Sequence, residues 1–428
     1  MNVRLTERLG AELRRYKGVP ASFAYSLANF LLAFALQRHM SLQGFGTFAI
    51  VQVYLQFGMS LSNGFFCAPL LLMINSAGKF DPGTIGSLSK ANLIACLLGA
   101  GGLAMIVSFS VTAPDTLLLV ALLAIATWMR WFYRAVELGE NNTQAPFLAD
   151  IYYCIVVTAG TAFIAYNGWF TLNAAFAVLA AGSVAAMATL SRHVILDAVA
   201  IVRAPFGPFL ASFRNHGRWA LLGVVTNEAT ANSFAYLVTG WLGPAAFAPI
   251  AAMNLFYRPI TILIQSLTQY ERPRMTHCAR NADYAQMGRE VNRFKFAAVT
   301  GAIGNFALAM ALLLLAPAAI GNADYPRDQL LLACFLIGGI SVLRAARAGD
   351  SAALQAMGQF RPLAWITVIT APVSLVLTAL AIWLAPQMVA MTLVGVLISE
   401  VLVCAMITLH LHNQLAAVAR AAVPSAAS

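Results

Sequence analysis

Two charged side chains stand inside long apolar runs between positions 219 and 273. Glu228 lies in the first run and Arg258 in the second, and a short Gly-Pro turn joins the runs. If the first helix enters a membrane at Trp219 and the second leaves it at Gln269, the charges lie about 14 Å and about 16 Å from the same side, for a rise of about 1.5 Å per residue. Charges at that depth need a partner or a water-filled cavity. We therefore expect Glu228 to pair with Arg258 in a functional site.

Amide side chains accompany these charges and widen the range of groups that such a site can bind. A guanidinium binds a phosphate through two parallel hydrogen bonds, and amides are partners for both phosphates and sugars. In an empty site Glu228 would hold Arg258, and it would take up a proton when substrate displaces it. The candidate substrate-binding residues are Arg258, Glu228, Asn254, Gln265, Asn232, Gln52, Gln56, Asn63 and Asn29.

A further carboxylate, Glu400, lies near the middle of the last apolar run and has no evident partner in the sequence. It is either a second titratable site or a contact between helices. We therefore take Glu228 and Glu400 as the candidates for ion coupling.

The elements that position these residues follow from the composition. Hydrophobic residues make up 60% of the chain and charged residues 10%, whereas soluble proteins carry about 25% charged residues. Apolar runs of about 20 residues predict membrane-spanning helices. We expect an all-α integral membrane protein with about twelve transmembrane helices. Their predicted centres are Phe30, Phe57, Gly99, Ala124, Val157, Leu179, Thr230, Tyr257, Leu308, Ile337, Pro372 and Leu397.

Neither motifs nor composition indicate catalysis, a metal or a cofactor. The six cysteines are scattered without a CxxC pair, and the chain lacks GxxxxGK[ST], HExxH and GxSxG motifs. The formal net charge of +10 would suggest nucleic acid in a soluble protein, but membrane topology explains it better here. We expect that the protein is not an enzyme and that it has no cofactor, no metal site and no nucleic-acid partner. Transport would then be driven by an ion gradient, the membrane potential or the substrate's own gradient.

The basic residues predict the orientation of the chain. Segment 1–18 alternates apolar residues with Arg and Lys, a pattern typical of a helix on an anionic membrane face. With this segment in the cytoplasm, the positive-inside rule places nearly all Lys and Arg inside, together with a tail over 413–428. Both termini are therefore predicted to be cytoplasmic. The inside group includes Arg130, Arg134, Arg344 and Arg347, and the outside group is Arg38 and Arg327.

Polar residues recur at a constant offset of 202 residues between the second and eighth spans. The matched pairs are Gln52 with Asn254, Gln56 with Arg258 and Asn63 with Gln265. Repeated halves with polar helix faces are typical of alternating-access transporters, whose site lies between the halves. We expect an N-lobe over 19–200 and a C-lobe over 201–412 around a central cavity. The alternative is that the amides only hydrogen-bond neighbouring helices, for about 0.6 kcal/mol each.

Two short motifs give the chain a family resemblance. The run Leu42–Ala49 reads LQGFGTFA after the first span, and a basic-aromatic segment extends from Arg130 (RWFYR) to Tyr153 (DIYY) between the fourth and fifth spans. With twelve spans in two halves, the chain resembles the polysaccharide-export flippases of the multidrug/oligosaccharidyl-lipid/polysaccharide superfamily. It departs from them at Glu271–Pro273, where members often carry a Phe-Pro pair.

The resemblance implies that the chain flips a lipid-diphosphate-linked oligosaccharide across a bacterial inner membrane, through a cavity lined by spans one, two, seven and eight. Its implied partners are this glycan lipid, membrane lipids and polysaccharide assembly proteins. Two alternatives stay open. A drug or cation antiporter of the same superfamily would have an acidic, aromatic cavity, and a membrane-embedded ligase or acyltransferase would need a large external loop.

The predicted topology is testable by labelling. A reporter fused after Arg420 is expected to be active only in the cytoplasm, and Gly243→Cys is expected to react with a membrane-impermeant reagent from outside, because the basic residues segregate to one side. An unlabelled Gly243→Cys together with an external C-terminus would contradict the span count.

Overall fold

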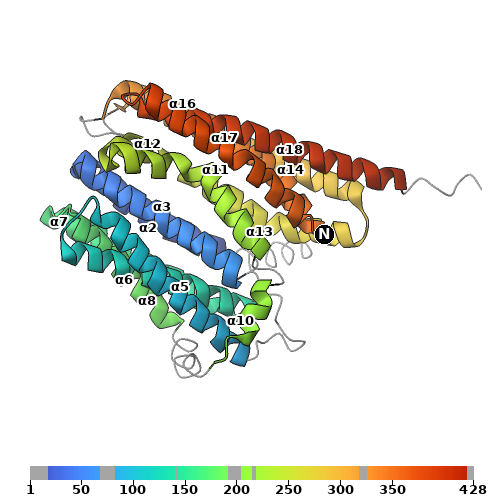
Figure 1. Ribbon diagram of the computed structural model, residues 1–428, viewed down its shortest axis with the longest axis horizontal. Coiled ribbons are helices and arrows are strands. Elements are labelled where there is room, and N and C mark those ends of the chain that lie inside the picture. Colours follow the sequence, from blue (N-terminus) through green and yellow to red (C-terminus); the bar gives the residue numbers. More distant parts are fainter. Residues whose placement is uncertain are drawn as a thin grey trace, which may run out of the picture. The chain divides into compact units, whose positions relative to one another are not determined.

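The computed structural model describes residues 18–67, 82–140, 142–190, 204–214, 218–317 and 325–421. Within these ranges every regular element is helical, as predicted (Figure 1). Positions 1–17 of the predicted amphipathic segment lie outside the described residues. The last helix continues through Ala421, so the start of the predicted tail over 413–428 is helical.

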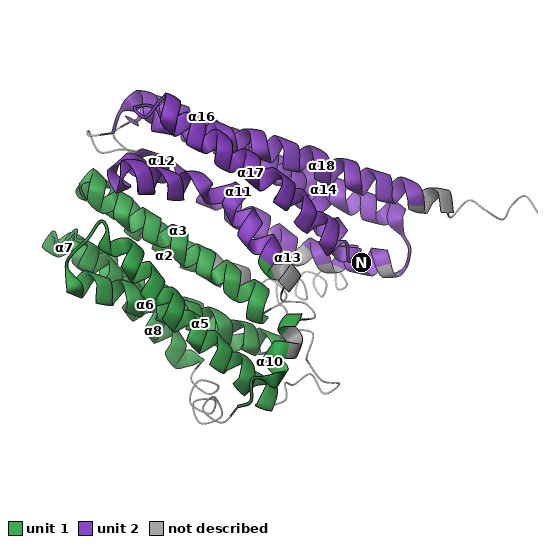
Figure 2. Ribbon diagram, in the orientation of Figure 1, with its two compact units in different colours: residues 1–221 green, residues 222–428 purple. Residues whose placement is uncertain are grey.

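The chain divides into two compact units, 1–221 and 222–428 (Figure 2). Unit 1 contains α2 (Gly18–His39), α3 (Leu42–Ser62), the π-helical turn η1 (Asn63–Cys67), α5 (Pro82–Ser108), α6 (Pro114–Gly139), α7 (Gln144–Asn167), α8 (Leu172–Thr189) and the short α10 (Gly207–Ser212). Unit 2 contains α11 (Arg218–Leu242), which starts just before the boundary, α12 (Pro244–Phe256), α13 (Arg258–Arg280), α14 (Tyr284–Leu315), α16 (Arg327–Ala356), α17 (Phe360–Leu384), the 3-10 turn η3 (Val389–Met391) and α18 (Thr392–Ala421).

The helices account for the predicted spans. In the described part of the chain, nine helices are long and apolar enough to cross a membrane, or ten if α12 and the start of α13 form one bent span. Helices α2 and α11, of 22 and 25 residues, occupy the two remaining predicted positions. The expectation of an all-α membrane protein with about twelve helices is confirmed.

Short polar side chains and glycine set several helix ends. Ser41, Thr171 and Asp283 each accept a hydrogen bond from the backbone N–H three residues later, at the starts of α3, α8 and α14. Gly168 ends α7 and Gly243 separates α11 from α12, both with positive φ (67° and 86°) that favours glycine. A labelling cysteine is therefore less strained at Ala245, in the first turn of α12, than at Gly243.

The predicted eighth span is not one straight helix. Tyr257, its predicted centre, separates α12 from α13, and the two helices are bent by 52°. Pro259, the second residue of α13, has no backbone N–H and so cannot continue the hydrogen-bond ladder of α12. Hydrogen bonds tie the break to two neighbouring helices. The Asn305 amide of α14 donates to the Phe256 carbonyl (3.1 Å), and the Tyr257 hydroxyl donates to the Cys334 carbonyl of α16 (2.7 Å).

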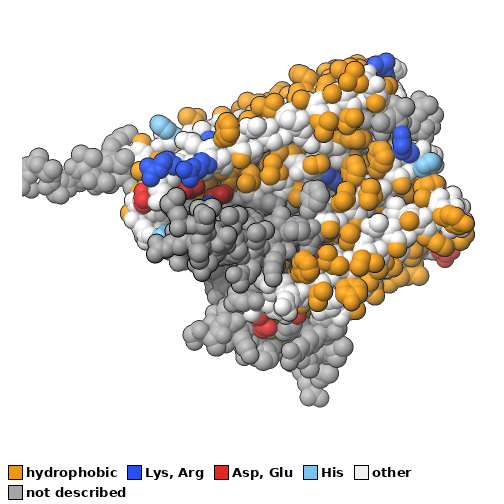
Figure 3. Space-filling model, turned by 180° about the vertical axis from the view of Figure 1, so that it is seen from behind, with side chains coloured by type: hydrophobic (Ala, Val, Ile, Leu, Met, Phe, Trp, Pro, Cys, Tyr) orange, Lys and Arg blue, Asp and Glu red, His pale blue; other side chains and the backbone are white. Residues whose placement is uncertain are grey.

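Each unit packs its helices pairwise around its own core. In unit 1, α7 packs on α8 and α2, and α6 packs on α5 and α8; in unit 2, α18 packs on α17 and α16, and α16 packs on α14. Large apolar side chains remain exposed, including Tyr166 (90%), Leu315 (86%) and Trp383 (77%). In Figure 3, hydrophobic side chains are spread over much of the described surface in view, and charged side chains lie mainly toward its edges. Such a surface suits lipid rather than water.

Two glycines make room for one tryptophan at the contact of α3, α5 and α6. A Cβ on Gly58 would lie 2.1 Å from the Trp128 indole, and one on Gly99 would lie 2.8 Å from it. Trp128 is fixed in place because its Nε1–H donates to the Leu55 carbonyl (3.0 Å). The close approach of these three helices therefore depends on the absence of two side chains.

Gly58→Ala is expected to lower the free energy of unfolding by about 1–3 kcal/mol, because the new methyl group collides with a ring that is held by a hydrogen bond. Gly102→Ala is the matched control, since a Cβ there meets no atom within 4 Å and alanine favours a helix. Thermal unfolding of the purified protein in detergent measures both variants. Equal unfolding temperatures would contradict the tight packing at Trp128.

Candidate functional site

Glu400 of α18 has a fully buried side chain in unit 2. Its two oxygens accept hydrogen bonds from Arg344 Nε (2.7 Å) and Arg347 Nε (2.9 Å), both in α16. Glu400 thus forms a contact between helices, which was one of its two predicted roles. The arrangement crosslinks α16 to α18 with three charges.

The same face of α16 continues this network. Arg344 also donates to the Ala231 carbonyl of α11 (3.4 Å). Asp350 is buried and accepts from Lys295 of α14 (2.7 Å) and from the Thr408 hydroxyl of α18 (2.7 Å). Because Arg344, Arg347 and Asp350 follow one another at spacings of three, they project from one side of α16. One helix therefore ties three others together through polar contacts.

Glu228 is held by neutral donors from its own helix. The Asn232 amide (2.9 Å) and the Tyr236 hydroxyl (2.5 Å) both donate to Glu228 Oε1, and the side chain is 7% exposed. The described hydrogen-bond partners of Glu228 thus lie within α11, whereas the expected pairing with Arg258 assumed that α12 and α13 form one straight helix.

Arg258 occupies the first position of α13, directly after the break, and is half-buried. Backbone N–H groups at a helix N-terminus have no partner inside the helix, and the helix dipole makes this end positive. Asn254 is half-buried in the last turn of α12, and Gln265 is exposed two turns into α13. Positive charge and amides thus flank the interruption of the bent span.

In unit 1, Asn29 belongs to a cluster that joins α2, α6 and α7. Its Oδ1 accepts from the Tyr153 hydroxyl (2.8 Å), and the Arg130 guanidinium lies 4.5 Å from the ring centres of both Tyr25 and Tyr153. Arg130 is 2% exposed, and its nearest carboxylate is Asp150 at 4.0 Å. Arg134 approaches the other oxygen of Asp150 (3.3 Å).

The three polar residues of α3 and η1 differ in their surroundings. Gln52 has a buried Nε2 without a hydrogen-bond partner among the described residues, and Gln56 is exposed. Asn63, at the start of η1, accepts a hydrogen bond from Trp131 Nε1 (2.8 Å). Gln52 and Gln56 are therefore the members of this stripe with hydrogen-bonding capacity to offer.

Four arginines are not loop charges as the topology argument assumed. Arg130 and Arg134 lie in α6, Arg344 and Arg347 lie in α16, and each pairs with a carboxylate inside its unit. Sequence reasoning missed these clusters as sites, although two signals were present. The signals are the RxxRxxD spacing of α16 and the basic-aromatic run of α6.

Among the residues that the structure describes, no group of three or more His, Cys, Asp or Glu side chains could hold a metal ion. The described residues around Glu400 in unit 2 and around Arg130 in unit 1 provide ion pairs, amides, hydroxyls and aromatic rings. These groups can bind an anion or a polar molecule, or exchange a proton.

No family model and no curated protein matches the sequence. Solved structures match over nearly the whole chain. An inward-facing multidrug resistance MATE family transporter of the MOP superfamily aligns with a TM-score of 0.65 and 14% identity, over 94% of this chain and 96% of that one. The chain has the fold of MOP-superfamily transporters.

Two other structures with this fold show its range. The eukaryotic MATE transporter AtDTX14 aligns with a TM-score of 0.63 at 13% identity, over 96% of this chain and 98% of that one. The lipid II flippase MurJ aligns with a TM-score of 0.61 at 11% identity, over 91% of this chain and 86% of that one. At such identities the likeness concerns the fold, and the substrate has to be argued from the residues.

Glu400→Gln is expected to lower the free energy of unfolding by about 1.5–3 kcal/mol, because it removes the charge from a buried acceptor of two charge-assisted hydrogen bonds, while the partly exposed guanidiniums of Arg344 (36%) and Arg347 (18%) can still reach water. Glu228→Gln is the matched control: it also neutralises a buried carboxylate, but its amide oxygen can still accept from Asn232 and Tyr236, so the loss should be much smaller. Thermal unfolding in detergent measures both. Adding Arg347→Gln to Glu400→Gln should recover part of the loss, and equal losses for Glu228→Gln and Glu400→Gln would contradict this account.

Proposed function

We propose that the protein is a membrane transporter that flips a lipid-diphosphate-linked oligosaccharide across the bacterial inner membrane by alternating access. The observation that carries the proposal is the break at Tyr257, which places Arg258 at the N-terminus of α13 within a bent membrane span. In transporters with interrupted helices, half-helix N-termini in the membrane point at anionic groups of the substrate. The break therefore favours an anionic substrate.

The electrostatics of this helix end support a diphosphate. A cation at a helix N-terminus is repelled by the positive end of the helix dipole. This repulsion lowers the stability of the helix by about 0.3–1 kcal/mol at an exposed site. An anion bound there reverses the sign of both contributions. Phosphate oxygens are suited to the planar guanidinium and to free backbone N–H groups. We propose that Arg258 binds the diphosphate through two parallel hydrogen bonds.

Amides on both units are proposed to bind the glycan. In unit 2 these are Asn254, Gln265 and Asn232, of which Gln265 is exposed. In unit 1, Gln52 and Gln56 are the stronger candidates. Asn29 and Asn63 already accept hydrogen bonds from Tyr153 and Trp131, so their contact with substrate would require those bonds to be exchanged.

For ion coupling we propose Glu228 rather than Glu400. Glu400 lies between two guanidiniums, which stabilise its charged form and oppose a change of protonation. The donors to Glu228 are a neutral amide and a neutral hydroxyl, so the carboxyl group can gain or lose a proton without breaking an ion pair. Transport by Glu228→Gln should accordingly no longer respond to an imposed pH gradient, and an unchanged response would remove Glu228 from this role.

A drug or cation antiporter is the second candidate function. The likeness to MATE transporters favours it as much as the likeness to MurJ favours a flippase. The local charge decides our preference, because a positively charged helix end with an arginine repels a cationic drug. Lipid-linked glycans, membrane lipids and polysaccharide assembly proteins are therefore the proposed partners, with both chain termini in the cytoplasm.

Arg258→Lys is expected to abolish most transport while protein abundance is maintained, because an ammonium keeps the charge but cannot form two parallel hydrogen bonds. Arg258→Ala should be more severe. Arg293→Lys is the matched control, since its side chain is 77% exposed in a surface pair with Glu290. Flipping of a fluorescent lipid-diphosphate glycan in vesicles made with the purified protein is the measurement.

Two outcomes would contradict the flippase. Full activity of Arg258→Lys would remove the bidentate contact from the proposal. Cells that lack the protein should accumulate lipid-linked oligosaccharide on the inner leaflet and lose a surface polymer. Normal surface polymer with new drug sensitivity would favour the antiporter instead.

A further inference from the structure

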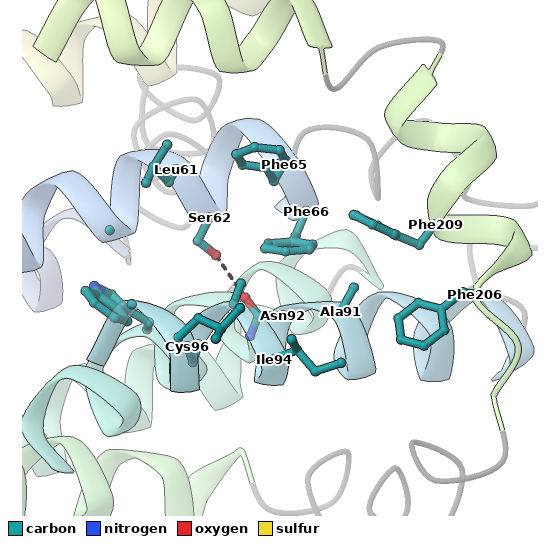
Figure 4. Close-up of a pocket in the computed structure, with 15 residues that line it drawn as sticks. Leu61, Ser62, Phe65, Phe66, Ala91, Asn92, Ile94, Cys96, Phe206 and Phe209 are labelled. Carbon is teal, nitrogen blue, oxygen red and sulfur yellow. Dashed lines mark hydrogen bonds between the residues drawn. The ribbon is translucent and has the colours of Figure 1, made fainter. Parts of the chain in front are cut away.

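A cavity of about 330 Å³ lies within unit 1, between α3, η1, α5, α6 and α10 (Figure 4). This volume is at the lower end of the range of small-molecule pockets, about 300–1,000 Å³. Its walls are mainly aromatic and aliphatic, and Phe66 lies beside Phe209 in the close-up. The large apolar lining residues include Phe65, Phe66, Ile94, Leu98, Phe206 and Phe209.

The two polar side chains of the lining are engaged with protein atoms. The Ser62 hydroxyl donates to Asn92 Oδ1 (3.4 Å), and Asn92 Nδ2 donates to the Met129 sulfur (3.4 Å). A polar ligand would have to break these bonds or leave its own groups unpaired, which is costly in an apolar cavity. The chemistry of the walls therefore selects an apolar occupant.

The side of α5 that borders the cavity is open toward the outside of the unit. Ile94 is 42% exposed and Leu98 is 73% exposed, and Ala95 between them is exposed as well. These residues lie in the middle of a membrane-spanning helix, where the surrounding medium is hydrocarbon. An occupant can therefore enter from the bilayer without crossing water.

A basic group stands at one end of the cavity. The Lys90 ammonium lies 4.9 Å from the ring centre of Phe206 and donates to the Ala204 carbonyl (3.4 Å), so it is held where α10 meets α5. Lys90 is one turn of α5 before Ile94. A lysine can extend its charged end to the membrane interface while its methylene groups stay in apolar surroundings. An apolar chamber with a cation at its end matches a lipid chain that carries an anionic headgroup.

We propose that this cavity binds one acyl chain of an anionic membrane phospholipid, with the headgroup at Lys90. The chain runs from the α5–α10 contact toward Trp128, and its methylene groups replace the missing contacts of the cavity walls. The site is built from residues of unit 1, whereas Arg258 and Glu228 belong to unit 2, and it does not depend on the transported substrate.

The experiment uses the full-length protein in vesicles that contain phosphatidylglycerol or phosphatidylcholine with a photoreactive group on one acyl chain. Mass spectrometry then locates the labelled residues. We expect labelling in the segments 58–66 and 90–99. Ala95→Phe, which fills the opening, should lose most of this labelling. Leu97→Phe is the matched control because Leu97 is 53% exposed on the same helix but does not line the cavity.

The headgroup is tested by Lys90→Gln. The wild type should prefer phosphatidylglycerol about fivefold, the ratio expected from one basic residue at an anionic lipid surface. Lys90→Gln should lose this preference and keep the chain labelling, whereas Arg38→Gln, which removes an exposed charge from the end of α2, should retain it.

Three results would overturn the proposal. The first is equal labelling of Ala95→Phe and Leu97→Phe, and the second is labelling spread evenly over all exposed helices. The third is displacement of the phospholipid by an isoprenoid diphosphate, because that result would assign the cavity to the transported lipid. Arg258→Ala should be labelled like the wild type. A loss of transport in that variant with normal labelling separates this site from the proposed function.

Discussion

The hydrogen-bonded ion pairs of Glu400 with Arg344 and Arg347 set conditions that much of unit 2 has to meet. A carboxylate that is wholly removed from water is stable only if both oxygens are satisfied, so α16 and α18 must keep one relative register. The same helix face then places Arg344 against α11 and Asp350 against Lys295 of α14. Charge compensation thus fixes the arrangement of four helices, which apolar packing in lipid alone would specify weakly.

Unit 1 meets the same demand with aromatic rings. Arg130 is nearly as deeply buried as Glu400 of unit 2, yet its nearest carboxylate is 4.0 Å away, and the faces of Tyr25 and Tyr153 lie against its guanidinium. Cation–π contacts of this kind gain strength where water is absent. Both units therefore contain an arginine-centred cluster among their helices, although the residues around the arginine differ.

The spans and the fold class could be predicted because each span needs only a run of apolar residues, which is a local property of the chain. The partners of Glu400 could not, since they lie 56 and 53 residues earlier and the sequence does not show which helix faces meet. The pairing of Glu228 with Arg258 was predicted from depths in straight helices, whereas the eighth span is bent and the described hydrogen-bond partners of Glu228 lie in its own helix. Pro259, directly after Arg258, carried the missing signal, as proline ends a helical hydrogen-bond ladder.

The position of α10 bears on how the protein is made. Phe209 of this short helix donates its backbone N–H to Ser87 Oγ of α5 (3.2 Å) and stacks on Phe66, so the last element of unit 1 contacts parts of the chain that were synthesised much earlier. Domains generally fold as units, the N-terminal one first, while the ribosome adds about 5–20 residues per second. Unit 1 can therefore complete its internal contacts in the membrane while most of α11 to α18 is still untranslated.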